Sequence, residues 1–366
     1  MKNINVLDYY NGKNVLVTGH TGFKGAWMTY LLLMAGANVT GYALKPPTNP
    51  SLFEVLGLDK EIKDSNLKGK LDNVYGDIRD LELLKESFAK AQPEIVIHMA
   101  AQPLVRESYI DPVGTYATNV MGTVNVLECC KLTKSVKSVV NVTTDKVYRN
   151  VEREEGYREG EELCGYDPYS NSKSCSELVT DSYRNSFLND LGMAVTTMRA
   201  GNVIGGGDFA KDRIIPDCVR AAVDSKQIIV RNPHSTRPYQ HVLEPVVCYL
   251  KMAAMQLENP SIASAYNIGP DDTDAVTTGK ITTMFCDTWN RLSGANITWV
   301  DKSDGGPHEA GFLKLDCTKI KTKLGWSPVW NINDAMDKLC EWYLAYSKGE
   351  DVREVTKNQI EEYNGQ

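Results

Sequence analysis

Three side chains that can donate, accept or carry a proton stand together in the string VTTDKVY, namely Thr144, Asp145 and Lys146. They follow a short, β-branched apolar run, VKSVVNV, which predicts a buried strand. Ligands of α/β proteins bind at the carboxyl ends of parallel strands. We therefore expect these three residues to handle protons in an active site.

A second pair of proton-handling residues lies in the string YSNSK. Tyr169 and Lys173 are four residues apart, so a helix places both on one face. An ammonium beside a phenol stabilises the phenolate, and we expect Lys173 to bring the pKa of Tyr169 from about 10 towards neutrality. Such a tyrosine takes a proton from an alcohol while hydride leaves the same carbon. The YxxxK pattern also decorates surface helices, so this interpretation depends on the Thr144 hydroxyl and on a nucleotide site.

The string TGHTGFKG predicts a binding site for the diphosphate of a dinucleotide. Its three glycines lie between an expected strand and the start of an expected helix. The first permits a tight turn, the second lets the diphosphate approach the backbone, and the third lets the helix pack on the sheet. The start of the helix also offers unpaired N–H groups to the anion. The cofactor contacts predicted here are Gly19, Thr21, Gly22, Phe23, Lys24 and Gly25.

The remaining contacts to the cofactor are less specific. The second expected strand ends in GYALKPP, where Lys45 stands in place of the acid that would bind the adenine ribose, so NAD and NADP both stay open. Asp77, with Ile78 beside it, follows the next strand and is a candidate for binding the adenine amino group. An N-terminal helix cap is an equally good role for Asp77, and Asp80 fits that cap better.

The segments that must position these residues alternate along the chain. Some have the apolar pattern of a strand, and those between them have the apolar pattern of a helix. Short apolar strands between amphipathic helices predict an α/β fold with a parallel sheet covered on both faces. Right-handed crossovers then make the sheet doubly wound, as in a Rossmann-type domain. From about Lys211 the elements become shorter and mixed, which indicates a smaller C-terminal lobe. We expect strands within 13–19, 38–44, 72–78, 93–101, 136–144 and 193–207, and helices within 23–37, 79–91, 111–132 and 169–187.

Composition excludes several classes of partner. The 366 residues carry a formal net charge of −7, which argues against nucleic acid and anionic membranes. Nine cysteines form no CxxC motif and five histidines have no ligand spacing, so we expect reduced thiols and no metal site. The N-terminus has no apolar signal core, and the longest apolar run, 26–37, is about half of the ~20 residues that a membrane span needs. We expect a cytoplasmic protein.

The glutamate-rich stretch 152–162 predicts a solvated loop.

The glycine turn and the strings HMAAQPLV, TNVMGT, VTTDKVY and YSNSK resemble the extended short-chain dehydrogenase/reductases that act on nucleotide sugars. The resemblance spans almost the whole chain, and it is closest to the CDP-glucose 4,6-dehydratase family, whose strings GHTGFKGAW, AAQPLVRESY and GYDPYSNSK are similar. It implies NAD as the cofactor and CDP-glucose as the substrate. It also implies that residues 1–200 form the NAD-binding domain with the catalytic residues. Residues 201–366 would mainly bind the sugar nucleotide, with some segments returning to the first domain.

The resemblance implies oxidation at carbon 4 of the glucose, elimination of water across carbons 5 and 6, and re-reduction at carbon 6. Oxidation needs Thr144, Tyr169 and Lys173, whereas elimination also needs an acid such as Asp145 to protonate the leaving hydroxyl. Epimerases of this superfamily typically carry small residues at that position. Asp145 therefore argues against the alternatives of a 4-epimerase or a dehydrogenase. A further alternative is a non-catalytic dinucleotide-binding protein. Such a protein would not need Thr144, Tyr169 and Lys173 together.

Lys146 stands where most sugar-nucleotide dehydratases have a glutamate that acts as the base at carbon 5. Three roles stay open for it. An unprotonated Lys146 is a base, a protonated one stabilises the enolate, and a purely structural one braces Asp145 as an ion pair.

Motif matches extend the expected contacts along the chain. For the cofactor they are Ala100, Ala101, Gln102 and Asn119, and for the substrate they are Asn202, Arg213, Arg220, Arg237 and His308. A guanidinium suits a diphosphate through its fixed fork of donors, but Arg213, Arg220 and His308 are equally compatible with ordinary surface charges. Enzymes of this kind pair through two long helices, here 111–132 and 169–188, so we expect a homodimer or homotetramer.

Overall fold

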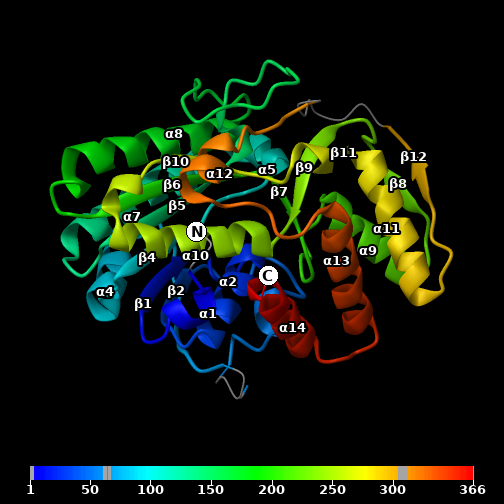
Figure 1. The fold of residues 1–366 in the computed structure, drawn as a ribbon, viewed down its shortest axis with the longest axis horizontal. Helices are drawn as coiled ribbons and strands as arrows, with labels where there is room; N and C mark the ends of the chain where they lie inside the picture. Colours follow the sequence, from blue (N-terminus) through cyan, green and yellow to red (C-terminus); the bar gives the residue numbers. More distant parts are fainter. Residues whose placement is uncertain (1–3, 61–63, 65–66, 304–311, 366) are drawn as a thin grey trace.

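The computed structural model describes residues 4–60, 64, 67–303 and 312–365. A seven-stranded parallel sheet forms its larger part, with the strand order β10-β6-β5-β4-β1-β2-β3 (Figure 1). The order reverses between β1 and β4, which makes the sheet doubly wound as expected. The strands are β1 (Asn14–Thr18), β2 (Asn38–Ala43), β3 (Lys70–Tyr75), β4 (Ile95–His98), β5 (Ser138–Thr144), β6 (Ala194–Ala200) and β10 (Ala265–Ile268).

Helices cover both faces of this sheet. One face carries α1 (Val6–Tyr9), α2 (Phe23–Met34) and α10 (Leu243–Glu258), which contact one another. The other face carries α4 (Leu81–Ala91), α7 (Gly122–Leu132) and α8 (Pro168–Tyr183). Successive side chains of a strand point to opposite faces, and β1 shows the result. Val15 and Val17 enter the core under α2 and α10, whereas Leu16 enters the core under α4 and α7.

The strands and helices predicted from the alternating pattern are present, with refinements in one strand and in the long helices. The strand expected at 193–207 consists of β6 and a second short strand, at 202–204, that belongs to another sheet. The helix expected at 111–132 consists of α6 (Pro112–Tyr116), a π-helical turn η1 (Ala117–Met121) and α7. Similarly, α8 continues into a π-helical turn, η3 (Arg184–Leu188). A π turn needs an i to i+5 hydrogen bond and is frequent at functional sites, but no residue pattern in the sequence signals it.

The smaller lobe is built on two short sheets on the right of Figure 1. A mixed sheet contains β7 (Asn202–Ile204), β9 (Thr236–His241) and β11 (Ala275–Thr277), and a parallel pair contains β8 (Ile228–Val230) and β12 (Trp299–Asp301). The second half of the chain also returns β10 and α10 to the large sheet. The domain boundary near residue 200 stays a prediction. Besides α10, the helices among the described residues of this half are α9 (Ile214–Val223), η4 (Pro260–Ile262), η5 (Asp272–Asp274), α11 (Thr278–Ser293), α12 (Thr318–Leu324), α13 (Ile332–Ser347) and α14 (Val352–Asn364).

The glutamate-rich segment between β5 and α8 is a loop with exposed glutamates, as expected, but one aromatic residue anchors it to the C-terminal lobe. Tyr157 is buried and stacks on Tyr148 with ring centroids 5.4 Å apart. Its amide donates to the Lys314 carbonyl and its carbonyl accepts from the Asp316 amide, both at 2.9 Å. Two of the glutamates form ion pairs with arginines, one within the stretch and one just before it, as in Arg153–Glu161 and Arg149–Glu162. The segment therefore contacts the C-terminal lobe through Tyr157, and these ion pairs offset part of its charge.

Within the described ranges, no helix is long and apolar enough to cross a membrane. The same part of the chain holds no group of three or more His, Cys, Asp and Glu side chains that could bind a metal ion.

Candidate active site

The short turn that follows β5, which we call the catalytic turn, holds a buried aspartate. Thr144 ends β5, and Asp145 begins the short 3-10 turn η2 (Asp145–Val147). The Thr144 hydroxyl donates to Asp145 Oδ1 at 2.9 Å, and Lys146 Nζ donates to the same oxygen at 3.1 Å. Asp145 is fully buried, and its Oδ2 has no hydrogen-bond partner among the described residues. Because buried polar atoms are normally paired, this unpaired oxygen marks the turn as a candidate site for a ligand.

The helix α8 places Tyr169 and Lys173 one turn apart, as predicted. Burial raises the pKa of Tyr169 to about 12, and a hydrogen bond with Thr144 offsets only part of this shift. Lys173 Nζ donates to the Val142 carbonyl at 3.0 Å, and burial lowers its pKa to about 8. The expectation that Lys173 brings the pKa of Tyr169 towards neutrality is therefore wrong for this structure. Loss of water around the phenol outweighs the hydrogen bond with Thr144 and the charge of Arg213, which lower the pKa.

The glycine turn has the shape that a diphosphate requires. Gly19 has a φ of +79°, and a Cβ atom there would lie 2.8 Å from the Ala100 nitrogen. A Cβ atom on Gly25 would lie 2.1 Å from the Gly19 carbonyl oxygen, so the helix can approach the turn only without a side chain. At Gly22 such an atom would meet nothing closer than 3.4 Å. Gly22 is also the N-cap of α2, and no side chain in the described residues caps it. The first amides of α2 are thus left to an anion.

Other residues of this turn have distinct surroundings. The Thr21 hydroxyl donates to the Leu44 carbonyl at 2.9 Å and so holds the chain after β2. Phe23 lies next to Gly205 of the smaller lobe. Burial, with a smaller contribution from the charge of Arg213, lowers the pKa of Lys24 to about 8. The charges of Lys173, Asp145 and Lys146 also act on the pKa of Lys24. The glycine turn and the catalytic turn therefore share one electrostatic environment.

The chain after β4 is held in place by Asn119. The Asn119 side chain lies in the middle of the π turn η1 and is buried. Its Oδ1 accepts from the Gln102 amide at 2.8 Å, and its Nδ2 donates to the Gln102 carbonyl at 3.0 Å and to the Ser172 hydroxyl of α8 at 2.9 Å. Asn119 therefore links the segment with Ala100, Ala101 and Gln102 to the catalytic helix. This agrees with a role in fixing the backbone of the site.

The two aspartates after β3 have separate partners. Asp80 caps α4 by accepting from the Leu83 amide at 3.1 Å, which confirms that prediction. Asp77 forms an ion pair with Arg79, with a shortest N···O distance of 2.6 Å. Ile78 is buried between them. Binding of adenine by Asp77 stays a prediction, since it would have to coexist with this ion pair.

Two of the expected substrate residues lie in the mixed sheet of the smaller lobe. Asn202 of β7 is the register partner of Tyr239 in β9. Arg237, also in β9, is buried and donates to the Thr236 carbonyl at 2.9 Å. The structure therefore brings Asn202 and Arg237 onto neighbouring strands, although they are far apart in the sequence.

The other expected substrate residues have different positions. Arg213 pairs with Asp208 at 3.0 Å, and its charge acts on both Lys24 and Tyr169, which puts it near the centre of the site. Arg220 is held on the surface of α9 by Asp217 and by the carbonyls of residues 209 and 210. His308 lies outside the described residues.

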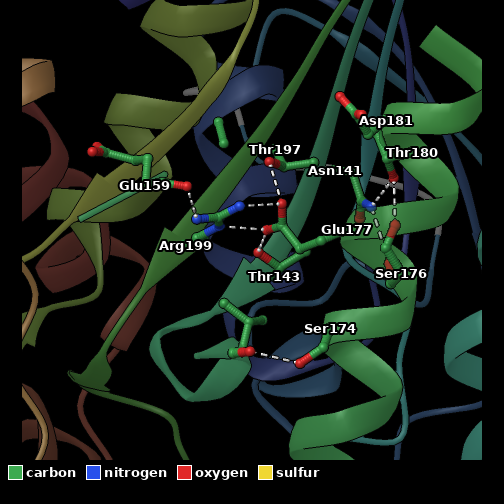
Figure 2. A network of polar contacts seen from close by, with 12 residues as sticks. Asn141, Thr143, Glu159, Ser174, Ser176, Glu177, Thr180, Asp181, Thr197 and Arg199 are labelled. Carbon is green, nitrogen blue, oxygen red and sulfur yellow. Dashed lines mark hydrogen bonds and ion pairs between the residues drawn. The ribbon is translucent and has the colours of Figure 1, made fainter. Parts of the chain in front are cut away.

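A buried ion pair beneath the catalytic turn was not found from the sequence. Glu177 of α8 and Arg199 of β6 are joined by two hydrogen bonds, of 2.8 and 3.0 Å (Figure 2). The hydroxyls of Thr143 and Thr197 also donate to Glu177. Burial raises the pKa of Glu177, but Arg199 and these hydroxyls outweigh it and leave the pKa below its usual value. Two signals could have found the pair: Glu177 follows Lys173 by one helical turn, and Arg199 interrupts an apolar strand.

Comparisons with known proteins agree with this geometry. Residues 16–339 match the family model described as GDP-mannose 4,6 dehydratase. The chain is 47% identical over 362 residues to the CDP-glucose 4,6-dehydratase of Salmonella typhimurium, and the alignment covers 97% of each chain.

Solved structures at lower identity share the fold. The crystal structure of dTDP-glucose 4,6-dehydratase from Bacillus anthracis in complex with NAD superposes with a TM-score of 0.74 at 21% identity, over 93% of this chain and 100% of that one. UDP-glucose 4-epimerase from Thermotoga maritima with UDP-glucose superposes with a TM-score of 0.73 at 21% identity, over 92% and 99%.

Proposed function

The chain belongs to the GDP-mannose 4,6-dehydratase family, and we propose that within this family it converts CDP-glucose to CDP-4-keto-6-deoxyglucose. The CDP-glucose 4,6-dehydratase at 47% identity supports cytidine as the nucleoside. The observation that carries the elimination step is the buried Asp145 with one unpartnered oxygen beside Thr144 and Lys146. A 4-epimerase or a dehydrogenase would not use this acid. The product would supply the synthesis of CDP-deoxysugars.

We propose NAD as the cofactor, in line with the NAD complex of the dTDP-glucose dehydratase that shares the fold. Bound NAD supplies a reversible hydride acceptor for the carbon that is oxidised. The residues fit such a group, because the space at Gly22 and the uncapped amides of α2 suit a diphosphate. Ala100, Ala101 and Gln102 would line the same cleft, with Asn119 holding them in place.

Oxidation at carbon 4 depends on Tyr169 and its neighbours. Tyr169 would take the hydroxyl proton while Thr144 orients the hydroxyl group. The pKa of about 12 shows that the phenol holds its proton in the free protein. A cation that approaches the phenol on ligand binding would lower that pKa, and Lys173 has the reach of one helical turn to do so.

Elimination of water depends on the catalytic turn. Asp145 would protonate the hydroxyl that leaves carbon 6 through its unpartnered Oδ2. Lys146 would act at carbon 5, either as the base or as the cation that stabilises the enolate, and its contact with Asp145 Oδ1 keeps it beside the acid. We expect Lys146→Ala to retain oxidation at carbon 4 and to lose solvent deuterium exchange at carbon 5, as measured by mass spectrometry. Normal turnover in this variant would rule out both roles.

Incubation with CDP-glucose and NAD⁺ tests the proposed function. A dehydratase produces the ultraviolet absorbance of the alkaline keto-sugar without net formation of NADH. A dehydrogenase accumulates NADH, and a non-catalytic dinucleotide-binding protein gives neither signal. The first result supports the proposal, and either of the other two overturns it.

We also propose that the protein is a cytoplasmic homodimer or homotetramer that pairs through the surface of α6, α8 and α5 (Val105–Ile110). Large apolar side chains are exposed there, including Ile110 (77%), Val113 (78%) and Leu178 (56%). We expect Leu178→Asp to shift the protein towards monomers in sedimentation velocity. Ile229→Asp is the matched control, because Ile229 is 52% exposed on β8 in the other lobe. An unchanged oligomer in the Leu178 variant would contradict this arrangement.

A further inference from the structure

We propose that the buried Glu177–Arg199 ion pair is a positioning device that holds the catalytic turn at both of its ends. The turn is η2 (Asp145–Val147), which follows Thr144 at the carboxyl end of β5, and it lies between Thr143 and Tyr148 in the chain. Both flanking side chains bond to the same ion pair. The inference rests on the proposed dehydration, since it assigns the ion pair to the elimination step.

The first end of the turn is held by the carboxylate. The Thr143 hydroxyl, in the last part of β5, donates to Glu177 Oε1. Glu177 lies one helical turn after Lys173 on α8, so this bond connects the strand before the turn directly to the catalytic helix. Arg199 Nε donates to the same oxygen at 3.0 Å and fixes its position (Figure 2).

The second end of the turn is held by the guanidinium. Arg199 NH1 donates to the Tyr148 hydroxyl at 2.7 Å, and the Tyr148 hydroxyl donates in turn to Asn267 Oδ1 at 2.7 Å. Tyr148 is buried, and its ring also lies against the guanidinium, with the Arg199 Cζ atom 5.1 Å from the ring centroid. The same NH1 donates to the Glu159 carbonyl at 3.0 Å. The chain after the turn is thus tied to β6 and β10.

A third bond holds the last residue of the turn from α8. The Ser174 hydroxyl, one residue after Lys173, donates to the Val147 carbonyl at 2.7 Å. In Figure 2 Ser174 points from the helix towards this part of the chain, below the ion pair of Glu177 and Arg199. All three bonds are buried, so the protein offers no water-exposed alternative for these groups.

These contacts should affect the elimination step more than the oxidation step. Asp145 and Lys146 lie on the turn itself. The three oxidation residues lie outside it, because Thr144 is held in the ladder of β5 with β6, and Tyr169 and Lys173 lie on α8. Loosening the turn therefore moves the acid and its neighbour relative to the oxidation residues. Since displacement of a catalytic group by about 1 Å can cost about a hundredfold in rate, elimination should suffer more than oxidation.

The test uses variants that remove one hydroxyl each and keep the ion pair. Thr143→Val and Tyr148→Phe preserve shape, and we expect each to lower dehydration of CDP-glucose by about tenfold. Oxidation at carbon 4 should stay within about twofold, so reduced cofactor should accumulate during turnover. Thr196→Val is the matched control. Its buried hydroxyl in β6 donates to Gln256 Oε1 at 2.7 Å, within a hydrogen-bond cluster that includes Ser138 at the start of β5.

Amide hydrogen exchange in the cofactor-free protein provides a readout that is independent of activity. We expect exchange of residues 144–149 to become about tenfold faster in Thr143→Val and Tyr148→Phe but not in Thr196→Val. Unchanged exchange together with an unchanged ratio of oxidation to elimination would overturn the inference, and so would equal effects in the control. If the parent protein does not dehydrate CDP-glucose but the exchange result holds, the proposed function fails while the positioning of the turn stands.

Discussion

Asp145 and Glu177 are both buried carboxylates at the same end of β5, but their surroundings differ. Glu177 receives two bonds from Arg199 and one each from two threonine hydroxyls, so both of its oxygens are occupied. Asp145 receives its bonds from Thr144 and Lys146 on Oδ1 alone, and Oδ2 receives none from the described residues. A fully bonded carboxylate holds elements together. A half-bonded one costs stability, and in the proposed reaction its unpaired oxygen would serve the substrate.

A third buried carboxylate shows what happens without a charged partner. Glu244 of α10 is fully buried and accepts from the amides of Val329 and Trp330 and from the Tyr363 hydroxyl. These donors are uncharged, and burial raises its pKa to about 7. The pKa of Glu177, equally buried, lies below its usual value because Arg199 is beside it. A counter-charge, and not the number of hydrogen bonds alone, decides which buried carboxylate is ionised.

Replacing the half-bonded carboxylate should produce the largest change in activity and little change in stability. We expect Asp145→Asn to lower dehydration by about 10²- to 10⁴-fold, because an amide cannot deliver the proton to the leaving hydroxyl. Oxidation at carbon 4 should persist, and the midpoint of thermal unfolding should stay the same or rise. Absorbance of the keto-sugar and calorimetry measure the two effects. Normal dehydration by this variant would remove the contrast with Glu177.

Replacing the fully bonded carboxylate should have the opposite pattern. We expect Glu177→Gln to lower the free energy of unfolding by about 3–5 kcal/mol, because Arg199 would remain buried without a counter-charge. Urea unfolding measures this loss. The double variant Glu177→Met/Arg199→Met is the control, since removal of both charges should cost less than removal of one. Equal stability of Glu177→Gln and the parent protein would show that the ion pair is not structural.

The carboxylate with neutral donors should make stability depend on pH. The folded protein holds the proton of Glu244 up to about pH 7, whereas the unfolded chain releases it from about 4.5. The free energy of unfolding should therefore fall as the pH rises between these values, by about 3 kcal/mol from this group, and should not fall further above them. Glu244→Gln should remove this part of the fall. Urea unfolding at the two ends of this pH range would check it, and an unchanged pH profile in the variant would contradict the raised pKa.

Several parts of the site followed from local patterns. The glycine turn, the cap at Asp80 and the spacing of Tyr169 and Lys173 depend on residues within a few positions of one another, and the structure contains all three. The Asn119 contacts were expected only in kind, because the π turn that directs its side chain has no sequence signal.

The sequence by itself determined the doubly wound sheet, the phosphate turn and the residues at the end of β5, because periodicity and glycine placement act over short distances along the chain. The tertiary structure alone decided the pKa of Tyr169 and the pairing of Glu177 with Arg199. Both depend on what surrounds a side chain after packing, since removal of water and the approach of a charge from another strand are not encoded in neighbouring residues.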